Sequence, residues 1–349
     1  MEFGINRMRH ELERNPISVI KVFTEALLGD DPLIEGSGIV VRPQRICSYL
    51  ANILKSIAQD AYPIEKDGVV LDGGDAIPPL EAIGCLRHDS YRVQMFLRGV
   101  RDAIREKLEN NGGEKVRVLY AGCGPFATLA LPLTTQFESS EVEFTLLDIH
   151  PESVTCIKKL IEELRLEEYF FGIYCCDAIT YRHQGEKPNI VMTETMNSAL
   201  LDEPQFPITL NLLKQTDHEG ILIPENIKVF TFIQDDRGCL KVLGEVFQVN
   251  RQIGMEINRA LKGAGLLLEG KMPIFTEVVI PNGVSGSIFL GTEICTFGKN
   301  SFSSIGNWRS SSLTDPIHLV DVDMNVQERT MYLNYVIGGK NEDIKWTDF

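Results

Sequence analysis

The stretch LYAGCGPFA, residues 119–127, follows an apolar run and contains Gly122, Gly124 and Ala127 in the pattern GxGxxA. Glycine allows a tight turn, and a ligand can approach its backbone closely because it has no Cβ. The preceding residues KVRVLYA, 115–121, are typical of a strand, and we expect the turn to open a helix. The pattern therefore predicts a cofactor of the nucleoside type. A dinucleotide and S-adenosylmethionine (SAM) both remain open at this point.

Further strands and one helix follow the glycine turn in alternation. We expect strands at 143–149, 171–178 and 189–194, and a helix at 152–166. This alternation predicts a parallel sheet covered by helices on both faces. Open sheets of this kind bind ligands beyond the carboxyl ends of their strands. Four residues stand at such ends and are expected to share one crevice: Gly122, Asp148, Asp177 and Glu194.

The segments on either side of this α/β pattern have different hydrophobic patterns. Residues 16–60 return apolar side chains at helical spacing, and 67–79 is a linker rich in Gly and Pro. After about 233 we expect an amphipathic helical stretch at 239–264 and then antiparallel strands, with a hairpin-like turn at 281–283. We predict an N-terminal helical region at 1–80, a Rossmann-like domain at 81–224 and a barrel-like β domain at 225–349.

Composition excludes several classes of protein. The formal net charge of −15, from 34 basic and 49 acidic residues, repels polyanions and argues against a nucleic-acid partner. The eight cysteines are scattered without a CxxC pair or His partners at ligand spacing, so we expect no metal site. No run of ~18 apolar residues is present to span a membrane. With the charged N-terminus, these features predict a soluble cytoplasmic protein without a membrane partner.

The segment TETMNSALLDE, residues 193–203, places Glu194 and Glu203 nine positions apart. It resembles the double-E loop of the protein arginine methyltransferases, a family of class I SAM-dependent methyltransferases. The segments HDSYR at 88–92, GILIP at 220–224 and GNW at 306–308 resemble further motifs of that family in the same order. The similarity runs in patches from about residue 89 to 343.

The resemblance implies a fold, a cofactor and a set of site residues. The fold would be α/β, with a seven-stranded Rossmann-like core and a C-terminal antiparallel barrel-like domain, and the protein would be a homodimer. The N-terminal helical region, expected from the spacing of its apolar residues, is additional to the family's pattern. The cofactor would be SAM. The helix at 239–264 would be the dimer arm, and the N-terminal helices are an alternative dimer surface. The residues implied are Arg92, Gly122, Gly124, Asp148, Asp177 and Glu194 for the cofactor, Glu194 and Glu203 for catalysis, and Met196, Asn307 and Trp308 for the substrate.

The paired glutamates suit a guanidino substrate. A guanidinium stays protonated and presents its donors in a rigid planar fork, which two carboxylates can hold from two sides. Such positioning can supply ~7–11 kcal/mol of a reaction barrier. We expect Glu194 and Glu203 to orient one guanidino nitrogen toward the methyl group of SAM.

The substrate is expected to be small. The family's tyrosine-rich substrate helix is not recognisable, SEWMG becomes TETMN, and the β domain ends early. These differences favour free L-arginine or another small guanidino compound over an arginine-containing protein. A true protein arginine methyltransferase, a small-molecule O- or N-methyltransferase, an NAD-dependent oxidoreductase and an inactive SAM-binding scaffold remain alternatives.

Overall fold

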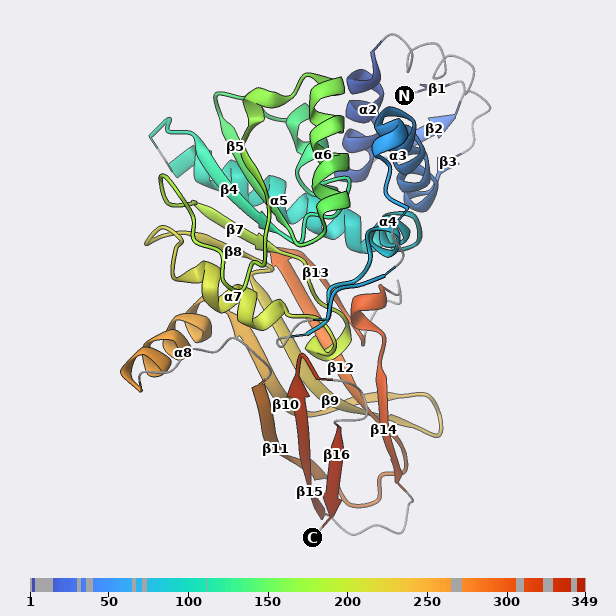
Figure 1. Cartoon of the computed structure of the whole chain (residues 1–349). Helices are drawn as coiled ribbons and strands as arrows, with labels where there is room; N and C mark the ends of the chain where they lie inside the picture. Colours follow the sequence, from blue (N-terminus) through green and yellow to red (C-terminus); the bar gives the residue numbers. More distant parts are fainter. Residues whose placement is uncertain are drawn as a thin grey trace.

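The structure is a computed structural model in which an α/β part stands above an elongated β part (Figure 1). It describes residues 2–3, 15–29, 33–35, 40–64, 67–70, 74–110, 112–264, 272–305, 311–322, 329–339 and 344–348.

Most of the described residues before 111 are helical. Asn15 caps the first long helix by accepting a hydrogen bond from the Ser18 backbone N–H, and Pro16 occupies the first helical position. The later linker makes a small bridge between Val69 and Ala76. The helices are α2 (Pro16–Leu28), α3 (Pro43–Ala58), η1 (Gln59–Ala61), α4 (Pro79–His88) and α5 (Ser90–Asn110), and short strands β1 (Glu2–Phe3), β2 (Leu33–Glu35) and β3 (Val40–Val41) form a separate small sheet.

The α/β part is built on a parallel sheet with the strand order β6-β5-β4-β7-β8. The order reverses at β4, which pairs with both β5 and β7, so the carboxyl end of β4 opens a crevice. Among the described residues this sheet has five strands, where seven were expected. They are β4 (Val116–Ala121), β5 (Val142–Asp148), β6 (Phe170–Cys175), β7 (Ile190–Thr193) and β8 (Ile221–Ile223).

Both faces of the sheet are covered, as the apolar strands predicted. Val118 and Tyr120 on β4 belong to the main core, which includes α5 and α6 (Pro151–Leu164). Leu119 and Ala121, which alternate with them, belong to a second cluster with α7 (Gln205–Leu213). Short 3-10 turns η3 (Glu167–Tyr169) and η4 (Ser198–Leu200) lie in the connections.

The predicted helix after the glycine turn is absent. Residues 124–130 form turns, and a 3-10 helix, η2 (Leu131–Thr135), follows. Pro125 and Pro132 interrupt this apolar segment, and Ala127 has a positive φ of 42°, which an α-helix does not tolerate. The loop therefore offers backbone turns, rather than a helix N-terminus, to a ligand.

The β part contains two antiparallel sheets that share a core formed by Ile233, Ile280, Ile288, Val322 and Met331. In the described residues they remain two sheets and not one closed barrel. The first has the order β10-β9-β12-β13, with β14 also on β12, and the second β11-β15-β16. The strands are β9 (Asn226–Asp235), β10 (Leu240–Asn250), β11 (Met272–Ile280), β12 (Gly286–Phe297), β13 (Asn300–Ser303), β14 (Ile317–Val322), β15 (Arg329–Ile337) and β16 (Lys345–Asp348), with η5 (Ser312–Thr314) before β14.

Two predictions for this part were wrong. Residues 240–250, expected to be helical, form β10 along β9, and only Arg251–Gly263 is the helix α8. The turn at 281–283 does not close a hairpin, because β11 pairs with β15 while β12 pairs with β9. In both places long-range strand pairing overrides the local pattern. None of the described helices has the length and apolar character needed to cross a membrane.

Candidate functional site

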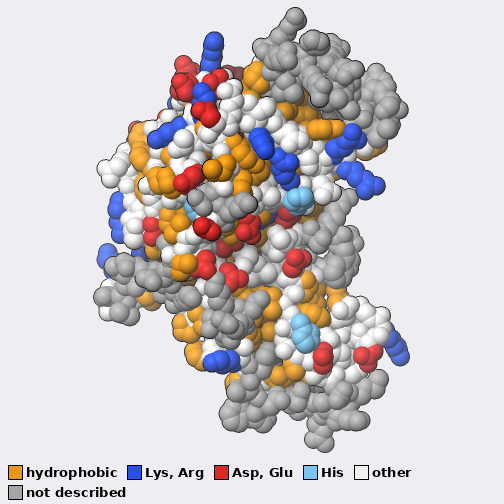
Figure 2. All heavy atoms as spheres, turned by 45° about the vertical axis from the view of Figure 1, so that its right-hand side comes forward, with side chains coloured by type: hydrophobic (Ala, Val, Ile, Leu, Met, Phe, Trp, Pro, Cys, Tyr) orange, Lys and Arg blue, Asp and Glu red, His pale blue; other side chains and the backbone are white. Residues whose placement is uncertain are grey.

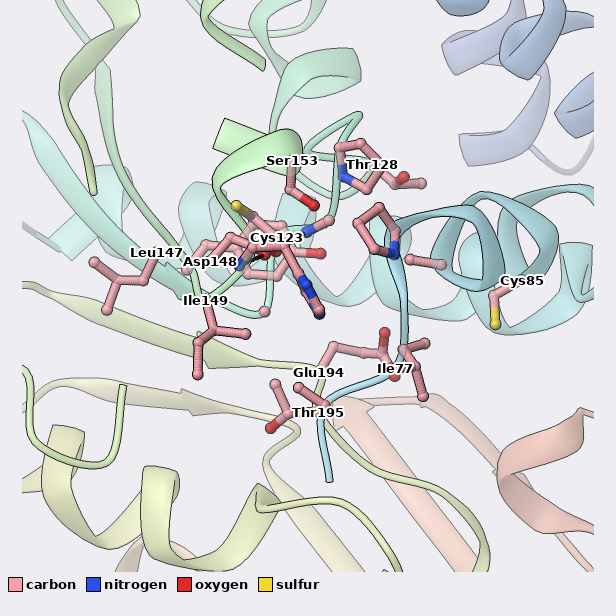
Figure 3. A pocket seen from close by; sticks show the side chains of 18 of the residues that line it. Ile77, Cys85, Cys123, Thr128, Leu147, Asp148, Ile149, Ser153, Glu194 and Thr195 are labelled. Carbon is pink, nitrogen blue, oxygen red and sulfur yellow. Dashed lines mark hydrogen bonds between the residues drawn. The ribbon is translucent and has the colours of Figure 1, made fainter. Parts of the chain in front are cut away.

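A cavity of about 1090 Å³, counting its open mouth, lies beyond the carboxyl ends of the parallel strands. Its walls include the four strand-end residues expected to converge, Gly122, Asp148, Asp177 and Glu194. Figure 3 shows Asp148 and Cys123 above this space, and Glu194, Thr195 and Ile77 below it. The crevice predicted from the strand order is therefore present.

The glycine turn is held against both neighbouring strands. Gly122 has a φ of +73°, and a Cβ there would lie 2.3 Å from Cγ2 of Thr195. Gly124 has a φ of +62° and donates its backbone N–H to Oδ2 of Asp148 at 2.8 Å. The backbone conformation thus favours glycine at both positions, and at Gly122 the close approach of the loop after β7 also excludes a side chain.

Asp148 closes the end of β5 and faces the cavity. Its second oxygen, Oδ1, accepts the backbone N–H of His150 at 2.9 Å. Burial raises the pKa of Asp148, and the two backbone hydrogen bonds counteract that rise. Nε2 of His150, which also lines the cavity, is buried without a hydrogen-bond partner among the described residues. Nε2 of His150 is therefore available to form a hydrogen bond with a polar ligand.

Arg92, in the first turn of α5, forms an ion pair with Oε2 of Glu194. The two side chains are only 11% and 12% exposed. Burial alone would lower the pKa of Arg92, but the charge of Glu194 raises it overall, so the guanidinium stays protonated. Burial raises the pKa of Glu194, and Arg92 offsets part of that rise. Oε1 of Glu194 is buried without a partner among the described residues.

Glu203 faces the same space from the far end of the loop at 194–203, called the acidic loop below. Its carboxyl group makes no hydrogen bond or ion pair with a described residue. Burial, and then the charge of Glu194, raise its pKa to about 8. The two glutamates therefore differ in their contacts. One oxygen of Glu194 forms an ion pair with Arg92, whereas the carboxyl group of Glu203 has no such partner among the described residues.

A second cavity adjoins the first and shares Arg92 and Glu203 with it. Ala76 lines both cavities, and Asp75 lines the second one. Gly74 packs on the acidic loop so closely that a Cβ would lie 2.6 Å from the Glu203 carbonyl carbon. Residues 74–76, which belong to the segment predicted to be a linker, therefore cover the acidic loop and are called the cover below. Figure 2 shows acidic side chains gathered across the middle of one face, between the α/β part and the β part.

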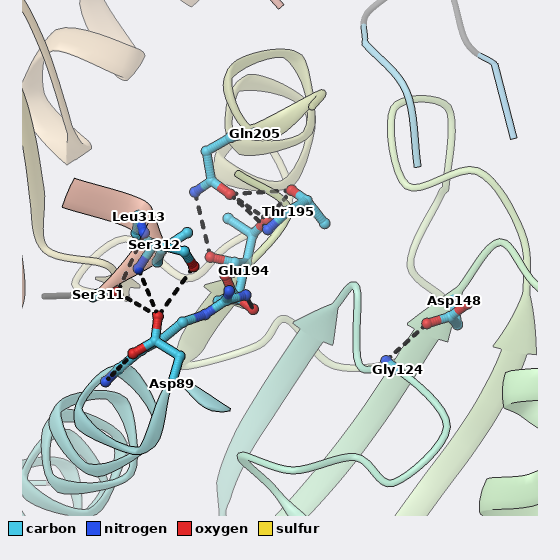
Figure 4. Close-up of polar contacts among 11 residues, drawn as sticks. Asp89, Gly124, Asp148, Glu194, Thr195, Gln205, Ser311, Ser312 and Leu313 are labelled. Carbon is cyan, nitrogen blue, oxygen red and sulfur yellow. Dashed lines mark hydrogen bonds and ion pairs between the residues drawn. The ribbon is translucent and has the colours of Figure 1, made fainter. Parts of the chain in front are cut away.

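Two hydrogen-bond networks fix the walls of the site (Figure 4). Oε1 of the buried Gln205 accepts the Thr195 backbone N–H at 3.1 Å and the Thr195 hydroxyl at 3.1 Å, which holds the start of the acidic loop. Oδ2 of Asp89 accepts the Ser311 hydroxyl at 2.7 Å and the Ser312 backbone N–H at 2.9 Å. Asp89 thereby ties the β part to the helix that bears Arg92.

The substrate residues expected from the sequence are only partly described. Met196 is buried and lines the second cavity, whereas Asn307 and Trp308 lie outside the described residues. Sequence reasoning missed several side chains that build the site. Asp202 could have been found beside Glu203, but nothing local distinguishes the others, Asp75, Glu81, Asn197 and Gln205.

Within the described residues, no group of three or more His, Cys, Asp and Glu side chains is arranged to hold a metal ion. All eight cysteines are free thiols.

No protein-family model and no curated protein sequence matches this chain. Among solved structures, the chain is similar to the Trypanosoma brucei PRMT1 enzyme-prozyme heterotetrameric complex with AdoHcy. The sequence identity is 11%, the match covers 75% of this chain and 94% of that chain, and the TM-score is 0.48.

Proposed function

We propose that this protein is a SAM-dependent N-methyltransferase that acts on the guanidino group of a small molecule, the class that includes free L-arginine. The observation that carries the proposal is the meeting of two largely enclosed glutamates, Glu194 and Glu203, with the glycine turn in one crevice. Glu203 and Oε1 of Glu194 are acceptors without donors among the described residues, beside the cavity that the strand ends form. A protonated guanidinium supplies donors to both.

The residues present fit SAM. Gly122 and Gly124 would face its methionine part, Asp148 and the unpartnered His150 would meet the ribose, and Asp177 would lie near the adenine. Arg92 would hold the carboxylate while keeping its bond to Glu194. When bound, SAM supplies a methyl group on a positively charged sulfur, which keeps the electron pair of the broken bond as the substrate nitrogen gains the methyl.

The chain's own residues account for the remaining chemistry. Glu194 and Glu203 orient the guanidino nitrogen and exclude alternative poses. The nitrogen must lose a proton as it gains the methyl group. Glu203 can accept this proton, because the bound guanidinium favours the ionised form of its carboxyl group and so leaves a carboxylate beside the nitrogen.

The cover over the acidic loop supports a small substrate. Gly74 and the segment that follows it pack against Asp202 and Glu203 and restrict the space beside the two glutamates. Acidic walls suit a cation, because the field of Asp75, Glu81 and Asp202 attracts it.

Mass spectrometry of the purified protein with SAM tests the proposal. The acceptors are free L-arginine, agmatine and an arginine-rich peptide. We expect a gain of one methyl on a small guanidine, and Glu194→Gln and Glu203→Gln should each lower turnover at least ~100-fold. Product on the peptide alone would assign a protein-modifying enzyme. Bound SAM without product on any guanidine would refute guanidine chemistry.

The expected homodimer and cytoplasmic location remain proposals. Helix α8 protrudes from the molecule and is a candidate dimer arm (Figure 1). Light scattering of the purified protein, with and without substitutions on α8, measures the oligomeric state.

A further inference from the structure

The acidic loop contains a strained backbone segment. Ala199, Leu200 and Asp202 have positive φ angles of 55°, 58° and 56°. None of them is glycine, and residues with a Cβ keep this left-handed conformation only where the surrounding structure enforces it. All three lie between Glu194 and Glu203, so the strained segment affects where the second glutamate lies relative to the first.

Contacts from the β part hold this segment. The backbone N–H of Ala199, which is fully buried, donates to Oγ1 of Thr292 on β12 at 2.8 Å. Two backbone hydrogen bonds of 2.8 Å each join residues 200 and 202 to residues 338–339 at the end of β15. The strained conformation is therefore fixed by strands that lie about a hundred residues further along the chain.

The first glutamate is held by the α/β part instead. The backbone N–H of Glu194 donates to the Ala121 carbonyl of β4 at 3.4 Å, and its side chain pairs with Arg92 on α5. Glu203 follows directly on the strained segment and precedes α7. The separation of the two carboxyl groups therefore depends on how the β part holds the loop.

We infer that Thr292 is a positioning residue for the proposed methyl transfer. Its hydroxyl, acting through the backbone of Ala199, keeps Glu203 where a guanidinium can meet both glutamates. The inference rests on the proposed function. Thr292 is only 1% exposed and lies outside the described lining of both cavities, so it acts through the loop and not by contact with a ligand.

The cofactor site gives a separate readout. Every described residue that lines the large cavity precedes position 209, so the β part contributes none of them. Loss of the Thr292 hydroxyl should therefore leave the affinity for SAM intact. A displaced Glu203 should slow the transfer, because a misplacement of about 1 Å in a reacting geometry can cost ~100-fold in rate.

Three variants test the inference. Thr292→Val keeps the shape of the side chain but removes the acceptor, and Thr292→Ser keeps the hydroxyl. Thr231→Val is the matched control, because Thr231 is fully buried on the neighbouring strand β9 and its hydroxyl donates to the Gly244 carbonyl on β10.

Kinetics and SAM binding are measured on each variant at a temperature where circular dichroism shows it to be folded. We expect Thr292→Val to lower kcat for the methylated guanidine at least about tenfold, with the Kd for SAM within about twofold of the wild-type value. Thr292→Ser and Thr231→Val should both stay close to wild type. If Thr292→Val does not fold, Thr292→Cys replaces it, since a thiol is a weak acceptor.

Hydrogen exchange tests the contact without any substrate. The amides of residues 198–202 should exchange faster in Thr292→Val than in Thr231→Val, because the Ala199 N–H loses its acceptor and the loop opens more readily. Mass spectrometry of the peptides that cover the acidic loop measures this difference.

The outcomes distinguish the inference from the function on which it rests. An unchanged kcat in Thr292→Val, an equal loss in Thr231→Val, a parallel loss of SAM affinity or unchanged exchange at 198–202 would each overturn the positioning role. If SAM binds but no guanidine is methylated, the proposed function is wrong, and faster exchange in Thr292→Val would still establish that Thr292 holds the loop.

Discussion

Arg92 and Glu194 form a buried ion pair that joins the first turn of α5 to the residue after β7. The pair lies where the strand order of the parallel sheet reverses, and both side chains line the large cavity. It leaves Oε1 of Glu194 unpartnered within the described structure and Glu203 uncommitted. The ion pair therefore supports the site, and it makes the roles of the two glutamates different.

Removing the charge of Glu194 should destabilise the protein. Glu194→Gln leaves the buried guanidinium of Arg92 uncompensated, and breaking such a pair costs ~3–5 kcal/mol. Chemical denaturation measures the free energy of unfolding. Glu163→Gln, which breaks a surface ion pair with Lys159 on α6, is the control and should leave stability nearly unchanged. A small effect at Glu194, similar to the control, would contradict the buried pair.

The stability of the protein should fall with rising pH in a window set by Glu203. Its folded pKa of about 8 lies above the ordinary value of 4.5, so the folded state holds a proton that the unfolded state releases. The stabilisation is complete below about pH 4.5 and is lost as the pH rises through about 8. Glu203→Gln should remove this part of the slope. Urea denaturation at several pH values in the window tests it, and equal slopes would rule out the raised pKa.

Binding of a guanidinium should release a proton near neutral pH. A cation beside Glu203 stabilises its ionised form, so the pKa falls from about 8 on binding. Calorimetry in buffers of different ionisation enthalpy counts the protons released. Glu203→Gln is expected to abolish the release even where binding persists. A wild-type enthalpy that is independent of the buffer would speak against this role.

The two glycines of the turn should respond differently to alanine. Gly122→Ala places a Cβ 2.3 Å from Cγ2 of Thr195 and 3.1 Å from the carbonyl oxygen of Glu194. The nearest atom to a Cβ at Gly124 is Cβ of Ala82, at 3.6 Å. Both changes carry a backbone strain of ~1–2 kcal/mol, but only Gly122→Ala must also move the acidic loop. We expect Gly122→Ala to lose more SAM affinity and stability, measured by calorimetry and thermal unfolding.

Asp89 should couple the β part to the site. Asp89→Asn weakens the hydrogen bonds from Ser311 and Ser312, and hydrogen bonds to charged groups contribute ~1.5–3 kcal/mol. We expect a loss of stability of that size and weaker substrate binding. A double-mutant cycle with Ser311→Ala isolates the coupling, and additive effects would show that the contact contributes nothing.

Much of the α/β part was predictable because its signals are local. The alternation of strands with a helix identified β4, β5, β6, β7 and α6, and the strand ends named Asp148, Asp177 and Glu194 before their positions were known. Parallel strands bring their carboxyl ends to one edge, so the crevice follows from the pattern. The prediction of a helix after the glycine turn was wrong, because Pro125 and Pro132 interrupt that segment.

The sequence by itself determined the residue types of the site and the strands β4, β5, β6 and β7 that carry it. Tertiary structure decided which residues became partners. Only folding placed Arg92 on Glu194, Asp89 on Ser311 and the cover at Gly74 over Glu203, since these contacts join segments far apart in the chain. Strand pairing likewise turned 240–250 into β10, because a neighbouring strand satisfies the backbone hydrogen bonds that a helix would form locally.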